Sequence, residues 1–113
     1  VIDNPNAPPK VRNLTPAQAD EQARAGTLTI VDVRPAEERA LASVNVPYAT
    51  FDDGPDEIEG WPKDTPLAFL CHHGVSSRQA AEYFRGLGFH DLHNVEGGID
   101  AWSAQHDPAV PRY

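Results

Sequence analysis

The sequence has very little cysteine: Cys71 is the only one in 113 residues. A single cysteine cannot form an intramolecular disulfide, and no group of cysteines and histidines has the spacing of a structural zinc site. The chain therefore shows no disulfide framework and no predicted metal site. This cysteine usage fits a reducing compartment, and we expect a cytoplasmic protein.

Long apolar runs are also missing. No stretch approaches the ~18–20 apolar residues that span a bilayer, and no charged segment followed by an apolar one marks a signal peptide. Basic residues are few: nine Lys and Arg are scattered without a patch, and the net charge is −8, with acids concentrated between Asp52 and Glu59. We therefore expect neither nucleic acid nor a membrane as a partner.

The length and composition favour one domain. A chain of 113 residues with 40% hydrophobic content can bury one core. Residues 1–10 contain three prolines and are expected to form an irregular lead-in. The domain is expected to cover residues 11–105, and an irregular tail to cover residues 106–113.

Segments typical of strands and helices alternate along this domain. Extended segments are predicted at 28–33, 44–51, 67–70 and 91–95. Helices are predicted at 16–26, 35–42, 77–87 and 99–105, the first with Thr15 as its cap. This alternation predicts a three-layer α/β fold in which helices cover both faces of a central, mostly parallel sheet. In such sheets, ligands bind at the carboxyl ends of the strands.

Cys71 lies at one of these strand ends, in the run L-A-F-L-C-H-H-G-V-S-S-R-Q-A-A. A glycine-bearing loop follows it, and a helix is expected to begin at about Ser76–Ser77. The sulfur would then lie among backbone N–H groups at the positive end of a helix dipole, which lowers the pKa of a thiol. A thiolate there could attack an electrophilic sulfur and become a persulfide without a metal or a cofactor.

Other interpretations of the same residues remain open at this point. A cysteine at the end of a buried strand is often only a small hydrophobe. His72 and His73 are interpreted as outward-pointing side chains at the entrance, and Ser76 and Ser77 as N-cap residues of the helix. A phosphatase or arsenate reductase would need an arginine six residues after the cysteine, where this chain has Ser77; Arg78 comes one residue later.

Four motifs in order resemble those of rhodanese-like domains. C-H-H-G-V-S-S-R-Q-A-A is similar to the active-site loop of single-domain rhodaneses. T-I-V-D-V-R resembles their Asp-x-Arg strand, P-A-E-E-R-A the helix after it, and V-E-G-G-I-D-A-W their Gly-Gly-x-x-x-Trp ending. Among rhodanese domains, the resemblance is closest to those related to monothiol glutaredoxins.

This resemblance implies a rhodanese-like fold and a sulfurtransferase. Cys71 would be the nucleophile that takes a sulfane sulfur from thiosulfate or a persulfide donor. It would pass this sulfur to cyanide or to a thiol acceptor such as a thioredoxin- or glutaredoxin-like protein. The anion-binding loop amides would be those of His72, His73, Gly74, Val75 and Ser76. The supporting residues would be Ser77, Arg78, Asp32 and Arg34. The alternative is a non-catalytic binding or redox-sensing module.

Overall fold

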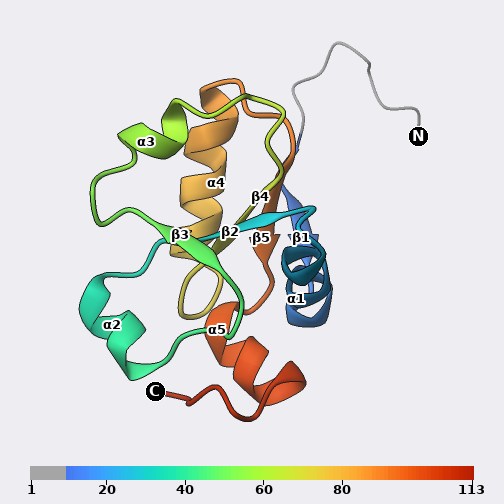
Figure 1. Ribbon diagram of the computed structural model, residues 1–113, viewed down its shortest axis with the longest axis vertical. Coiled ribbons are helices and arrows are strands. Elements are labelled where there is room, and N and C mark those ends of the chain that lie inside the picture. Colours follow the sequence, from blue (N-terminus) through green and yellow to red (C-terminus); the bar gives the residue numbers. More distant parts are fainter. Residues whose placement is uncertain (1–9) are drawn as a thin grey trace.

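The computed structural model describes residues 10–113, which form a three-layer α/β fold (Figure 1). Five strands form one sheet in the order β1-β5-β4-β2-β3, and all neighbouring strands are parallel. From β1 to β5 the strands are Arg12–Leu14, Thr29–Asp32, Tyr48–Thr50, Leu67–Leu70 and Leu92–Val95. The helices α1 to α5 are Pro16–Ala25, Ala36–Leu41, Asp56–Glu59, Ser76–Gly86 and Gly98–Ala101. The predicted fold class is confirmed.

Strand β1, the short helix α3 and the bounds of the last helix differ from the sequence-based expectation. Strand β1 was not predicted, because three residues are too few to show a periodic pattern; it exists because Arg12 and Leu14 pair with β5 at the sheet edge. The last helix begins at Gly98, and it continues beyond Ala101 as a π-helical turn over Trp102–His106. Most of the lead-in predicted for residues 1–10 lies outside the described residues.

The first helix shows how strongly local sequence sets its ends. The Thr15 hydroxyl accepts a hydrogen bond from the Gln18 N–H, and the Gln18 side chain accepts one from the Thr15 N–H, which forms a capping box. Gly26 ends the helix with a φ of 78°, a left-handed conformation that glycine adopts without strain. Within residues 10–113, none of the helices has the length and apolar character needed to cross a bilayer.

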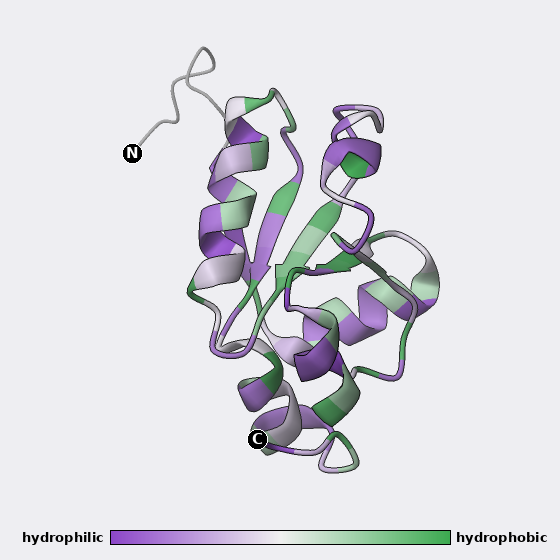
Figure 2. Cartoon of the chain, turned by 90° about the vertical axis from the view of Figure 1, so that its left-hand side faces the viewer, coloured by the Kyte–Doolittle hydropathy of each residue, from purple (hydrophilic) through white to green (hydrophobic). Residues whose placement is uncertain are grey.

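Apolar side chains pack on both faces of the sheet. Figure 2 shows the strands, which carry many hydrophobic residues, between the two helical layers. In β4, Ala68 and Leu70 belong to the core on the face of α1 and α5, whereas Leu67 and Phe69 belong to the core on the face of α3 and α4. This alternation follows from the two-residue period of a strand. β4 is thus buried on both sides, which holds its carboxyl end in place.

The sheet topology creates a crevice where β4 ends. The chain leaves β2 through α2 toward β3, whereas it leaves the neighbouring β4 through α4 toward β5 on the other side. Such a divergence of connections between adjacent parallel strands is where ligands bind in open α/β sheets. Cys71 follows β4 directly, and Val33 donates a backbone hydrogen bond of 2.9 Å to Leu70 next to it.

The first turn of α5 lies directly against the backbone that follows β4. The Ile99 N–H donates to the Cys71 carbonyl at 2.8 Å, and the Asp100 N–H donates to the His72 carbonyl at 3.0 Å. Gly98 has a φ of 64°, and a Cβ atom there would lie only 2.4 Å from the His72 carbonyl oxygen and 2.5 Å from that of Cys71. Glycine is therefore required at this position for steric reasons.

Replacing Gly98 with Ala is expected to lower the free energy of unfolding by clearly more than the ~1–2 kcal/mol that a left-handed conformation costs an L-residue, because the methyl group would also collide with two carbonyls. The matched control is Gly54→Ala, since Gly54 has a φ of 87° but no other group lies within 4 Å of where its methyl group would be. Denaturant unfolding of both variants measures the difference. Equal losses would contradict the steric argument.

Candidate active site at the end of strand β4

Cys71 is buried at the start of the loop that joins β4 to α4. The Gly74 N–H donates to its Sγ atom at 3.1 Å, and Sγ lies 3.1 Å from the Ser77 hydroxyl. Gly74 turns the loop with a φ of 90°, and a Cβ atom there would lie 3.0 Å from the Gly97 nitrogen. The loop therefore curls around the sulfur and packs against the Gly97–Gly98 turn.

The surroundings of Cys71 favour its thiolate. Burial alone would raise the pKa of the thiol, but hydrogen bonds from the Ser76 and Ser77 hydroxyls and from the Ser77 and Gly74 N–H groups outweigh it, so the pKa of Cys71 is lowered. The sulfur also lies near the first turn of α4, an 11-residue helix, where the helix dipole favours a negative charge. The direction of this pKa change agrees with the expectation from the sequence.

A chain of buried hydrogen bonds continues from Ser77. Its hydroxyl donates to Asn94 Oδ1 at 2.6 Å, and Asn94 Nδ2 donates to the Gly74 carbonyl at 2.9 Å. Asn94 therefore connects the helix and the loop on either side of the sulfur. It was not among the predicted site residues; its place in the buried strand L-H-N-V makes hydrogen-bond partners necessary, since a buried amide needs them.

The interpretation of Ser76 and Ser77 as N-cap residues is wrong. The N-cap is Val75, which has an αR conformation and makes no side-chain capping bond. Ser76 and Ser77 are the first two helical residues, and Ser77 is fully buried. Its hydroxyl bonds to Cys71 and Asn94 rather than to the helix backbone, because the neighbouring strand β5 brings Asn94 within reach.

The two histidines after Cys71 differ in their surroundings. His73 is exposed, whereas His72 is half-buried beneath the C-terminal residue Tyr113. The two rings of His72 and Tyr113 stack with centroids 3.9 Å apart and an interplanar angle of 7°, and His72 Nε2 donates to the backbone oxygen of Tyr113 at 2.8 Å. The sequence held no signal for Tyr113, since 41 residues separate it from His72.

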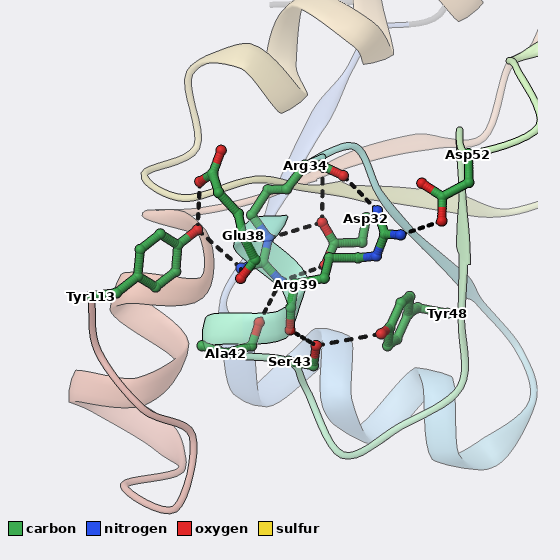
Figure 3. A network of polar contacts seen from close by, with 9 residues as sticks. All are labelled: Asp32, Arg34, Glu38, Arg39, Ala42, Ser43, Tyr48, Asp52 and Tyr113. Atoms are coloured by element: carbon green, nitrogen blue, oxygen red, sulfur yellow. Dashed lines mark hydrogen bonds and ion pairs between the residues drawn. The ribbon is translucent and has the colours of Figure 1, made fainter. Parts of the chain in front are cut away.

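Asp32 and Arg34, predicted as supporting residues, form a fully buried ion pair (Figure 3). Arg34 Nε and Nη2 donate to the two Asp32 oxygens at 3.0 and 2.6 Å, and Nη2 also donates to the Ala42 carbonyl at 2.8 Å. Nη1 donates to the Tyr113 hydroxyl at 3.0 Å, and that hydroxyl donates to Glu38 at 2.7 Å. The pair thereby connects β2, α2 and the C-terminal tail.

Arg78 is directed toward the sheet edge. Its Nη1 donates to Asn13 of β1 at 3.1 Å. Arg78 also lines a surface cavity of about 540 Å³, together with Gly74, Val75, Gln79 and Glu82. This cavity meets the cysteine loop on the side of α4.

Comparisons with known proteins agree with this geometry. A family model described as a rhodanese-like domain matches residues 15–105. The thiosulfate sulfurtransferase GlpE of Pseudomonas putida (strain GB-1) is 35% identical over 98 residues, which cover 84% of this chain and 87% of that protein. A rhodanese-related protein from Thermoplasma volcanium has a TM-score of 0.69 at 27% identity and covers 90% of this chain and 99% of its own. For a rhodanese-like domain protein from Staphylococcus aureus the TM-score is 0.68 at 28% identity, with 91% and 99% covered.

Replacing Asp32 with Ala is expected to lower the free energy of unfolding by about 3–5 kcal/mol, because the buried Arg34 guanidinium would lose its carboxylate partner. The matched control is Asp52→Ala, which removes the exposed member of an ion pair with Arg39 and should cost about 0–1 kcal/mol. Chemical denaturation measures both. Similar small losses would show that the buried pair does not brace the fold.

Replacing Ser77 with Ala is expected to raise the pKa of Cys71, because the thiolate loses a hydrogen-bond donor. The rate of alkylation by iodoacetamide as a function of pH measures the change, and the curve should shift to higher pH. Ser103→Ala serves as the control, since that buried hydroxyl donates to the Val110 carbonyl instead. An unchanged curve for the Ser77 variant would contradict the assignment.

Proposed function

Since the chain belongs to the rhodanese-like domain family, and is a rhodanese-type enzyme, we propose that it is a sulfurtransferase that carries a sulfane sulfur on Cys71 as a persulfide. The observation that carries this proposal is the position of Sγ, which lies 3.1 Å from the Gly74 N–H inside a loop that lowers the pKa of the thiol. The curated relatives named thiosulfate sulfurtransferase GlpE support the same activity.

In the first half-reaction, the Cys71 thiolate attacks the outer sulfur of thiosulfate. A bond forms between Sγ and that sulfur, the sulfur–sulfur bond of thiosulfate breaks, and sulfite leaves with the electron pair. The enzyme then holds Cys–S–S⁻, and the total charge is unchanged. Because the attacking group is already a thiolate, this step needs no general base.

In the second half-reaction, a thiolate acceptor or cyanide attacks the terminal sulfur of the persulfide. The sulfur–sulfur bond breaks, and its electron pair returns to Cys71 as the thiolate. Between the two steps the terminal sulfur is an anion, which backbone N–H groups can stabilise. We assign this role to the amides of the loop, namely those of His72, His73, Gly74, Val75 and Ser76.

The donor is proposed to be thiosulfate or a persulfide, and the acceptor a small thiol or the thiol of a thioredoxin- or glutaredoxin-like protein. The two positions after Cys71 hold histidines, whereas lysine or arginine side chains there would attract the thiosulfate dianion more strongly. We therefore propose a persulfide as a donor beside thiosulfate. A relationship to rhodanese domains associated with monothiol glutaredoxins fits such an acceptor. A reducing compartment such as the cytoplasm suits a carrier whose only cysteine must return to the thiolate.

Replacing Cys71 with Ser is expected to abolish sulfur transfer while the protein stays folded, because serine has nearly the same volume. Thiocyanate formation from thiosulfate and cyanide measures the transfer, and intact-mass analysis shows whether the wild-type protein gains one sulfur atom. Asp52→Ala, a change at an exposed ion pair, should leave both measurements unaltered. Thiocyanate formation by the serine variant would refute the persulfide mechanism.

A further inference from the structure

Three potential metal ligands meet beside the cysteine loop. One ring nitrogen of His72, one of His73 and one carboxylate oxygen of Asp100 all lie within 4.8 Å of one another. The histidines belong to the loop after β4, and Asp100 belongs to the first turn of α5. Sulfur transfer as proposed above makes no use of these three side chains.

Backbone hydrogen bonds hold the two chain segments that carry these ligands against each other. The Asp100 N–H donates to the His72 carbonyl at 3.0 Å, next to the bond of 2.8 Å between Ile99 and Cys71. The rings of His72 and His73 stack with centroids 3.9 Å apart. The backbone bonds already hold the two chain segments together, so binding an ion would require rotation of the exposed His73 ring out of this stack but little further ordering of the backbone.

The tautomer of His72 suits a metal ligand. The backbone oxygen of Tyr113 can only accept a hydrogen bond, so the His72 nitrogen that contacts it, Nε2, carries the proton. In the neutral ring the lone pair is then on Nδ1, which can bind a metal while the Tyr113 contact is kept. Metal-binding histidines typically donate their other ring N–H to a carbonyl or carboxylate in this way.

Asp100 can take part although it pairs with Arg112. Arg112 Nε and Nη2 donate to its two oxygens at 3.0 and 3.2 Å. A carboxylate has about four lone-pair sites and retains two when a guanidinium occupies the others. The pair also orients the carboxylate, as hydrogen-bonded partners of metal-binding carboxylates do.

We propose that His72, His73 and Asp100 form a binding site for one divalent transition-metal ion of the Zn²⁺ type at the edge of the cysteine loop. Two imidazoles and a carboxylate suit Zn²⁺ and Co²⁺, and three protein ligands leave a coordination position open. Ligand atoms around a tetrahedral zinc lie about 3.4 Å apart at bond lengths of ~2.1 Å. The ligand atoms lie within 4.8 Å of one another, and rotation of the exposed His73 side chain would bring them to this shorter separation.

The experiment is a titration with Zn²⁺ by calorimetry and with Co²⁺ by visible absorption, on the full chain carrying Cys71→Ser. This background removes the thiolate, which would otherwise bind the metal. It also separates this proposal from the sulfurtransferase mechanism, because the background variant is inactive under that mechanism. One ion is expected to bind per chain, with a tetrahedral or five-coordinate Co²⁺ spectrum.

Asp100→Asn and His73→Ala, each added to that background, are expected to weaken binding about tenfold or more. The matched control is Asp91→Asn, because Asp91 contacts another histidine, His93, at 2.8 Å. The affinity of this control variant for the metal ion should not change. The proposed site would be overturned if the Cys71→Ser background bound no metal ion. It would also be overturned if Asp91→Asn and Asp100→Asn weakened binding equally.

Discussion

The contact between the first turn of α5 and the backbone of Cys71 and His72 is the constraint on which the site depends. Two N–H groups of that turn bond the two carbonyls, and the absence of a side chain at Gly98 lets the segments approach this closely. These bonds fix the backbone that leads into the loop, whose Gly74 N–H donates to Sγ at 3.1 Å.

The Ser77 hydroxyl is one of the groups that determine how the thiol responds to its surroundings. The Ser77 hydroxyl gives its proton to Asn94, so toward the neutral thiol it acts as an acceptor of the S–H bond. When the thiol ionises, the hydroxyl can stabilise the thiolate only by turning that proton from Asn94 to Sγ. The contribution of this hydroxyl to the thiolate therefore depends on a competition between Asn94 and the sulfur for one proton, within a buried network.

The C-terminal tail joins parts of the site that the chain keeps far apart. The Tyr113 ring stacks on His72. Its hydroxyl accepts a hydrogen bond from Arg34 and donates one to Glu38 (Figure 3). The buried Asp32–Arg34 pair is thus connected to the loop that holds the sulfur, through one aromatic side chain. Displacement of the tail would disturb both the ion pair and the position of His72.

Features that rest on local chemistry could be predicted from the amino-acid sequence, whereas the residues that complete the site could not. Thr15 and Gly26 set the ends of α1, and the strand–glycine loop–helix pattern located Cys71, because conformational preferences act over a few neighbouring positions. Strand β1 instead exists through its pairing with β5, and Ser77 bonds Asn94 across the sheet. Tyr113 contacts partners 41 and 79 positions away. No local pattern encodes such contacts, since they form only when the cores on both faces of the sheet bring the elements together.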